Sequence, residues 1–345
     1  MKLSLFDFPL NEHLIAVKPA EPRDHSRLMV VRQGEISSTH HLFHEIVQFF
    51  NPGDVLVLNR TKVRPVHLSA QCGGRSIDVL LVAPRIPGQW EVMVKPFKHL
   101  RRAEKVEFPS EVEARVSYGI SGEPLLTFSD PSVVEGLLRQ FGEMPLPPYI
   151  LKRRKKMNSN GWKDHEWYQT VYAEEEGAIA APTAGLHFTE AVLNALRQKG
   201  VEIGWITLHV GAGTFLPVRV EEVEEHRMLP ETVEVGAETV QLINQTKTRG
   251  SRVFAVGTTV VRALESAALS GSLSSFKGMT DIFMYPGFEF KVIDGLLTNF
   301  HLPCSTPLVL VSAFAGRERV MAWYAEASAK EYRWLSYGDA MLILP

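Results

Sequence analysis

The alternation of apolar and polar residues changes along the chain and predicts two kinds of structure. Between about Val66 and Phe128, short runs such as Trp90–Lys95 and Val112–Ser117 alternate at period two, and glycine or proline residues separate them. Such alternation predicts strands with one buried face, and closely spaced strands joined by tight turns predict an antiparallel sheet or barrel. We therefore expect residues 66–150 to form an inserted domain built as a small antiparallel sheet or β-barrel.

Outside this region, strand-like and helix-like patterns alternate. A buried strand is predicted within 52–59. Further segments are expected as strands at 177–181, 201–208, 252–256 and 281–285, and as helices at 237–249, 258–270 (capped by Thr258), 309–315 and 317–330, with another helix between the N-cap Thr189 and the C′ residue Gly200. Strands that alternate with helices predict an α/β fold. The expected architecture is a large mixed α/β domain, residues 1–65 plus 151–345, interrupted by this β-rich insertion.

The composition narrows the class of protein. The 345 residues are 45% apolar and 22% charged, which permits a sizeable core and excludes a disordered or collagen-like chain. The net charge of −2 supplies no bulk positive field, so a nucleic-acid partner would need a local basic patch. Two cysteines support neither a disulfide framework nor a zinc site, and no apolar run approaches a membrane span. We expect a cytoplasmic monomer that contacts no membrane.

A glycine-containing loop, His209–Pro217, follows one predicted strand. It does not fit a dinucleotide-binding fingerprint, because Leu216 stands at the third glycine position and Pro217 follows where a phosphate-binding helix should begin. Two interpretations stay open: a tight turn that needs small residues, or a loop whose backbone lies against a flat ligand.

Two strand-to-helix junctions carry polar residues that suit a binding site, since α/β proteins usually bind ligands at the carboxyl ends of strands. His187 lies close to a predicted helix start, which lowers the pKa of an imidazole and attracts anions. A histidine held by a backbone carbonyl is the equal alternative. Thr258 and Thr259 offer groups for a carboxylate or phosphate, and Arg262 and Glu265 follow as a surface pair or an interior pair.

Two other clusters of polar residues have less specific signatures. Asn299 and His301 precede an apolar helix, without the nucleophile elbow of a serine hydrolase. His40 and His44 have the spacing of a helical metal-binding pair, but no third ligand is in view, and we expect no metal centre.

Positive charge gathers in five consecutive residues, Lys152, Arg153, Arg154, Lys155 and Lys156. Most charge runs are solvated surfaces, but five cations beside a domain boundary can bind RNA phosphates. We predict that this run binds RNA.

Many ordered segments match a single family, namely 23–28, 51–59, 143–149, 168–173, 180–189, 207–218, 255–259, 298–303 and 336–341. Through them the chain resembles the S-adenosylmethionine:tRNA ribosyltransferase-isomerase family of queuosine biosynthesis over essentially its whole length. The resemblance implies an α/β domain with an inserted barrel. It also implies transfer and isomerisation of the ribosyl part of S-adenosylmethionine onto 7-aminomethyl-7-deazaguanine, at the wobble position of tRNA with a GUN anticodon. The implied products are epoxyqueuosine-tRNA, adenine and methionine, and S-adenosylmethionine is a co-substrate, so no cofactor is expected.

The implied chemistry requires a base that removes a proton from the ribose 5′ carbon, and histidine titrates in a suitable range. We rank His187 and His209 ahead of His226 and His301. His187 lies at a helix start and His209 opens the glycine loop, whereas His226 lies in an acidic segment that would keep it protonated, and His301 is expected only to cap a turn.

Asp339 and Glu225 complete the catalytic candidates, because a carboxylate suits a guanine-like edge or a sulfonium cation. Arg262 and the Thr258–Thr259 junction suit the methionine carboxylate. Substrate binding is predicted for residues that can anchor the ligand, stack on a base or line the glycine loop: Asn59, Arg64, Thr183, Phe188, Gly211, Gly213, Thr214, Thr258, Thr259, Arg262, Asn299, His301 and Tyr337.

The chain departs from the family pattern at Arg60, Leu229 and Pro307, and Leu229 takes the place of a histidine. Two other classes stay open. An S-adenosylmethionine-dependent RNA methyltransferase would need a glycine fingerprint that the chain lacks. A non-catalytic RNA-binding protein would need a strongly basic face, which the net charge of −2 disfavours.

Overall fold

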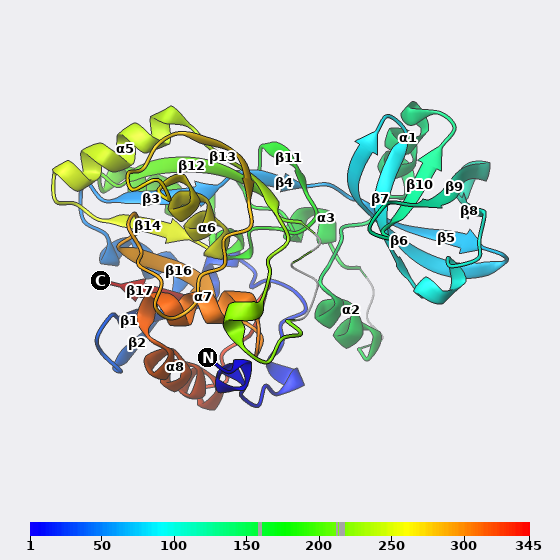
Figure 1. Ribbon diagram of the computed structural model, residues 1–345. Helices are drawn as coiled ribbons and strands as arrows, with labels where there is room; N and C mark the ends of the chain where they lie inside the picture. The colour runs from blue at the N-terminus through cyan, green and yellow to red at the C-terminus, as the bar shows by residue number, and fades with distance from the viewer. Residues whose placement is uncertain (158–160, 212, 214–217) are drawn as a thin grey trace. The chain divides into compact units, whose positions relative to one another are not determined.

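The computed structural model describes residues 1–157, 161–211, 213 and 218–345. These residues form two compact units, Met1–Lys62 with Pro147–Pro345 and Val63–Leu146 (Figure 1). The second unit is one continuous stretch inserted into the first. It begins at Val63 rather than at the expected 66 and ends at Leu146 rather than at 150.

The first unit is built around a nine-stranded mixed sheet with the order β15-β13-β12-β3-β14-β16-β17-β1-β2. Its strands are β1 (Arg27–Arg32), β2 (Ser38–Leu42), β3 (Val55–Asn59), β12 (Glu202–His209), β13 (Glu231–Val235), β14 (Val253–Val256), β15 (Phe276–Thr280), β16 (Gly295–Asn299) and β17 (Ala340–Leu344). Strands β12, β3, β14 and β16 run parallel, and β17 is antiparallel to β16 but parallel to β1. The mixed sheet confirms the predicted α/β class.

Helices cover both faces of this sheet. They include α4 (Glu190–Gln198), α5 (Ala237–Thr248), α6 (Thr258–Ala267), α7 (Thr306–Ala315), α8 (Arg317–Ala329) and the 3₁₀ segments η4 (Phe43–Phe49) and η7 (Thr183–His187). Strand β3 shows why the sheet needs a layer of helices on each face. Val55 and Val57 join the core formed with α5 to α8, while Leu56 and Leu58 join the core formed with α4 and η4. Both faces of the strand are buried, which explains its unbroken apolar run.

The second unit is a closed barrel with the strand order β10-β7-β6-β5-β8-β9, coloured cyan to green in Figure 1. Its elements are β5 (His67–Cys72), β6 (Arg75–Ile86), β7 (Gln89–Lys95), β8 (Lys105–Phe108), β9 (Val112–Tyr118), β10 (Pro124–Phe128) and helix α1 (Pro131–Phe141). Every strand pair in it is antiparallel. The antiparallel pairing predicted from the period-two pattern is therefore confirmed, and the closed barrel is the form that the family resemblance implied.

Short elements complete the first unit. They are β4 (Thr61–Val63, which crosses into the second unit), α2 (Pro148–Lys155), α3 (Asp164–Trp167), β11 (Glu175–Ala178) and η9 (Val223–Glu225), and β4 pairs with β11. Within the described residues, none of the helices has the length and apolar character needed to cross a membrane.

Several local predictions need correction. The strand expected at 281–285 is absent, because Thr280 Oγ1 accepts a hydrogen bond from the Ile282 N–H and the Ile282 carbonyl accepts one from Arg262. The sheet strand lies just before this segment, as β15. Helix α6 is capped by Gly257, whose φ of +88° suits glycine, and not by Thr258. The N-cap at Thr189 is confirmed, since Thr189 Oγ1 accepts from the Val192 N–H.

Candidate active site

A cavity of about 600 Å³ lies in the first unit at the carboxyl ends of the parallel strands β12, β14 and β16. Val210 follows β12, Gly257 follows β14 and Asn299 ends β16, and all three residues line the cavity. The volume is that of a small-molecule site, and its location is where α/β folds usually bind ligands. The predicted residues that line it are Lys152, Thr183, Gly213, Thr258, Thr259, Asn299 and His301.

Two helix N-termini face this cavity. Thr258 and Thr259 form the first turn of α6, and Thr306 and Pro307 form the first turn of α7. Unpaired backbone N–H groups give a helix start a partial positive charge, which favours an anionic ligand group. Pro307, one of the departures from the family pattern, occupies a first-turn position where proline is well tolerated.

His187 lies behind the cavity wall in a chain of hydrogen bonds. Its Nδ1 lies 2.8 Å from Ser26 Oγ and its Nε2 lies 3.1 Å from Asn299 Nδ2, while Thr183 Oγ1 donates to Asn299 Oδ1 at 2.8 Å. The imidazole stacks on Phe43 and is 4% exposed. Burial lowers the pKa of His187 to about 4. The ring is therefore neutral at pH 7 and is separated from the cavity by Asn299.

His301 lines the cavity directly. Its Nε2 lies 2.8 Å from Thr298 Oγ1, and its backbone N–H donates to the Tyr324 hydroxyl at 3.2 Å. Burial lowers the pKa of His301 to about 3. His301 is thus a neutral imidazole exposed to the ligand space. The sequence ranking placed it behind His187 and His209, because neither its burial nor its neighbours could be seen from the sequence.

The other two candidate histidines do not line the cavity. His209 ends β12, and its Nδ1 lies 2.8 Å from Thr61 Oγ1; burial lowers its pKa, while Glu175 and Glu234 raise it. His226 packs edge-on against Phe283, and burial lowers its pKa as well. The expectation that acidic neighbours keep His226 protonated is therefore wrong.

Arg262, predicted to hold the methionine carboxylate, forms a buried ion pair with Glu231. The same carboxylate accepts a hydrogen bond of 3.0 Å from the Gly211 N–H, and the Arg262 Nε donates to the Ile282 carbonyl. Arg262 does not pair with Glu265, which instead accepts backbone N–H groups of 291–293. This network holds Gly211, at the start of the glycine loop, and its arginine lies outside the cavity lining.

The two carboxylates that the sequence predicted to be catalytic occupy very different surroundings. Asp339 is 1% exposed and accepts hydrogen bonds from the side chains and backbone N–H groups of Arg27 and Arg333. This bonding ties β1 to the turn that precedes β17. Glu225 ends η9 with an exposed side chain. Neither carboxylate lines the cavity.

Several residues predicted to bind substrate do not line the cavity and instead support its wall from behind. Asn59 is 1% exposed, and its amide bonds to the Leu208 backbone, the Thr61 N–H and Thr259 Oγ1. The rings of Phe188 and Tyr337 are buried, packed edge-on against Phe43 and Tyr168 respectively.

The remaining predictions fall in three places. Arg64 belongs to the barrel unit, where its guanidinium pairs with Glu135. Gly213 lines the cavity and lies against Leu229, the residue that replaces a family histidine. Thr214 lies outside the described residues. Arg60, another departure, pairs with Glu174 and Glu175.

The basic run lies on α2 and divides into two kinds of residue. Arg154 is 8% exposed, pairs with Asp164 through two hydrogen bonds of 2.6 and 2.8 Å, donates to the Val17 carbonyl and stacks on Trp162. It anchors the helix. Arg153 is half-buried, whereas Lys152, Lys155 and Lys156 are exposed, and Lys152 also lines the cavity.

The cavity residues that sequence reasoning missed include Tyr149, Tyr168 and Ser336, of which Tyr149 and Ser336 share a hydrogen bond of 2.6 Å. Each of these three residues lies within a segment that matched the family. Only Tyr337 and Asp339 were selected from these segments, because the sequence does not reveal which of the neighbouring hydroxyls faces the ligand space.

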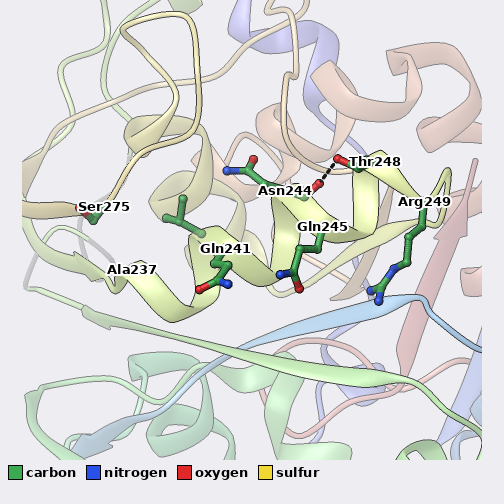
Figure 2. Close-up of a pocket in the computed structure, with 8 residues that line it drawn as sticks. Ala237, Gln241, Asn244, Gln245, Thr248, Arg249 and Ser275 are labelled. Atoms are coloured by element: carbon green, nitrogen blue, oxygen red, sulfur yellow. Dashed lines mark hydrogen bonds between the residues drawn. The ribbon is translucent and has the colours of Figure 1, made fainter.

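A second hollow lies on the outer side of α5, where Gln241, Asn244 and Gln245 are drawn in Figure 2. Thr248 donates to the Asn244 carbonyl within the helix, and Arg249 pairs with Glu202. Its polar groups are amides and hydroxyls without a buried charge or an imidazole. The chemistry-bearing groups converge at the strand ends instead.

A mixed α/β sheet, an inserted closed barrel and a cavity with polar side chains at the strand ends together define an α/β protein with a small-molecule site. The family model described as "Queuosine biosynthesis protein" matches residues 3–343, and the chain belongs to this family.

Named relatives match this chain over its whole length. The chain is 48% identical to a S-adenosylmethionine:tRNA ribosyltransferase-isomerase of Halothermothrix orenii and 46% identical to one of Carboxydothermus hydrogenoformans, with 100% of each chain covered. A crystal structure of S-adenosylmethionine tRNA ribosyltransferase from Thermotoga maritima superposes with a TM-score of 0.57 at 36% identity, covering 99% of this chain and 100% of the other. The protein is thus an enzyme of queuosine biosynthesis.

Proposed function

We propose that this enzyme, acting as a monomer, transfers and isomerises the ribosyl part of S-adenosylmethionine onto 7-aminomethyl-7-deazaguanine at the wobble position of tRNA with a GUN anticodon. The products are epoxyqueuosine-tRNA, adenine and methionine. The observation that carries the proposal is the cavity at the strand ends, whose lining comes largely from segments that match the family.

Different cavity residues suit different steps of this reaction. A base takes a proton from the ribose 5′ carbon, which the adjacent sulfonium acidifies, and His301 is the lining imidazole suited to that step. Adenine then leaves, and the substrate amine attacks the ribose-derived fragment. Methionine leaves as the epoxide closes. The helix starts at Thr258 and Thr306 suit binding of the methionine carboxylate, and the ring of Tyr149 suits contact with a nucleobase.

The proposal is tested by following three parts of S-adenosylmethionine separately. With tRNA that carries 7-aminomethyl-7-deazaguanine, label in the ribose is expected in tRNA, label in adenine as free adenine, and label in the methyl group as free methionine. Equal amounts of the three products support the proposal. Methyl label in tRNA would identify a methyltransferase instead, and tRNA binding without any product would identify a binding protein.

We predict that Lys152 binds a phosphate of the tRNA at the mouth of the cavity. Lys152 Nζ lies 2.7 Å and Lys156 Nζ lies 2.5 Å from the Glu12 carboxylate, which therefore competes with a phosphate for both cations. These two lysines hold the pKa of Glu12 at about 2, so Glu12 is ionised at neutral pH. Replacing Lys152 by alanine should weaken tRNA binding and reduce the magnitude of its salt slope by about one.

Two further variants make this prediction specific. Glu12→Gln removes the competing charge and should tighten tRNA binding, whereas Lys277→Ala, a change at an exposed lysine on β15, should leave the salt slope unchanged. The measurement is tRNA affinity across a salt series, with S-adenosylmethionine affinity as a second readout. Equal salt slopes for the wild-type and Lys152→Ala enzymes would mean that Lys152 is a solvated surface residue that binds no tRNA phosphate.

A further inference from the structure

A continuous set of hydrogen bonds connects a buried serine to the wall of the cavity. Ser26 precedes β1, His187 ends η7, Asn299 ends β16 and Thr183 begins η7. Ser26, His187 and Asn299 are each at most 4% exposed, whereas Thr183 lines the cavity. These four residues, called the Ser26–Thr183 relay below, come from three separate parts of the chain, which meet only in the folded first unit.

The chemistry of an amide sets the direction of this relay. Asn299 Nδ2 can only donate, so the His187 Nε2 at 3.1 Å must accept. The proton of the neutral imidazole is then on Nδ1, which donates to Ser26 Oγ at 2.8 Å. Asn299 Oδ1 can only accept, so the Thr183 hydroxyl donates to it at 2.8 Å. Each of the three hydrogen bonds in the relay therefore has a defined donor and a defined acceptor.

The surroundings keep His187 neutral, as this direction requires. An imidazolium has no acceptor and could not receive the amide N–H of Asn299. Burial lowers the pKa of His187 to about 4; among the charged groups nearby, Asp339 raises it and Arg333 and Arg23 lower it. The relay accordingly keeps one direction at neutral pH.

The direction of the relay determines which hydrogen-bonding groups Thr183 offers at the cavity wall. The single hydroxyl proton of Thr183 is used inside the protein, so its oxygen offers only lone pairs to the ligand space. We propose that the Ser26–Thr183 relay fixes Thr183 as a hydrogen-bond acceptor that selects an N–H or O–H donor on the bound ligand, with His187 as a positioning residue.

This inference rests on the proposed function for the identity of the ligand. S-adenosylmethionine carries suitable donors in its ammonium, its adenine amino group and its ribose hydroxyls. A ligand that presented an acceptor at this point would leave two facing lone pairs unpaired in a partly dry site, which is unfavourable. The relay therefore contributes specificity rather than a proton to the reaction.

The first experiment measures S-adenosylmethionine binding by calorimetry for the isosteric pair Thr183→Val and Thr183→Ser. Valine removes the acceptor and should raise the Kd about tenfold, while serine keeps it and should recover most of the affinity. Thermal unfolding of both variants checks that the fold is kept. An unchanged Kd for Thr183→Val would overturn the proposal.

The second experiment tests the direction of the relay and the role of His187. Asn299→Asp still accepts from Thr183, so it should lower affinity less than Thr183→Val does; a larger loss in a folded variant would mean that Thr183 donates to the ligand. His187→Gln can accept from Asn299 and donate to Ser26, so it should raise KM less than His187→Leu. Equal KM values for wild-type and folded His187→Leu enzyme would overturn the positioning role.

Binding and products separate this inference from the proposed function. Wild-type enzyme that binds S-adenosylmethionine but releases no adenine with substrate tRNA would contradict the proposed function and leave the relay testable by affinity. Normal product formation together with an unchanged Thr183→Val affinity would contradict the relay alone.

Discussion

Replacing His301 by glutamine is expected to lower the rate of adenine release by roughly 10²–10⁴-fold, the usual loss when a general base is removed. Of the four candidate histidines, only His301 is among the described residues that line the cavity. When its Nε2 carries the proton and donates to Thr298 Oγ1, the lone pair of Nδ1 can accept a proton from the substrate.

The pH dependence gives this prediction a second readout. Burial lowers the pKa of His301 to about 3, so the ring stays neutral and competent at any working pH. The rate should therefore show no fall attributable to His301 between pH 8 and pH 5, because protonation would remove the base only near pH 3. A base of such low pKa is weak, and the step relies on the acidity that the sulfonium gives the 5′ carbon.

The control is His41→Gln, which changes a histidine on β2, outside the cavity lining. It should leave turnover close to that of the wild-type enzyme, and S-adenosylmethionine binding to His301→Gln should stay measurable. If His301→Gln enzyme released adenine at a near-normal rate, the base would lie elsewhere, and His187 and His209 would be the next residues to test.

Replacing Arg262 by methionine is expected to destabilise the enzyme by about 3–5 kcal/mol, the usual effect of leaving one partner of a buried ion pair alone. Glu231 is 6% exposed and Arg262 is 7% exposed, so water cannot solvate the remaining carboxylate. Gly211 also loses the well-positioned acceptor for its N–H. Urea unfolding of the wild-type and variant enzymes measures the difference.

Two further variants separate the contribution of the buried ion pair from other effects of the Arg262→Met substitution. The double variant Arg262→Met with Glu231→Gln should recover part of the loss, since no charge is left buried. Lys277→Met breaks an exposed pair with Glu234 and should change the stability far less than Arg262→Met does, because solvent screens an exposed ion pair. If Arg262→Met kept full stability and lost only S-adenosylmethionine binding, the carboxylate-anchor role predicted from the sequence would be correct after all.

The large features of the fold could be predicted because they depend on periodic patterns. Alternation at period two indicated an antiparallel sheet or barrel, and the unbroken apolar run at Val55–Leu58 indicated a strand covered on both faces. The strand prediction for 281–285 failed because its apolar side chains resemble a strand, while its backbone bonds to Thr280 Oγ1 and Arg262. The first bond is local and the second reaches a helix residue 20 positions earlier, and the apolar pattern encodes neither.

The candidate site was predictable by location but not by role. The strand-to-helix junctions supplied Thr183, Thr258 and Asn299, which do line the cavity. Arg262 and Asp339 looked like ligand groups because their charges were visible and their partners were not. A charged residue in a matched segment can serve the ligand or the scaffold equally well, and only the position of its counter-ion distinguishes the two.

The place of β17 in the sheet has a consequence for synthesis of the chain on the ribosome. Residues 340–344 follow every other strand of this sheet in the chain, and they form a fully buried strand between β16 and β1, which comes from the N-terminal part of the chain. The barrel, by contrast, is contiguous from Val63 to Leu146 and can close while the nascent chain is still growing. The first unit cannot complete its sheet until β17 has been synthesised and has left the exit tunnel. Until that moment β1 and β16 lack a neighbour, and the half-built sheet is the species that chaperones would have to protect.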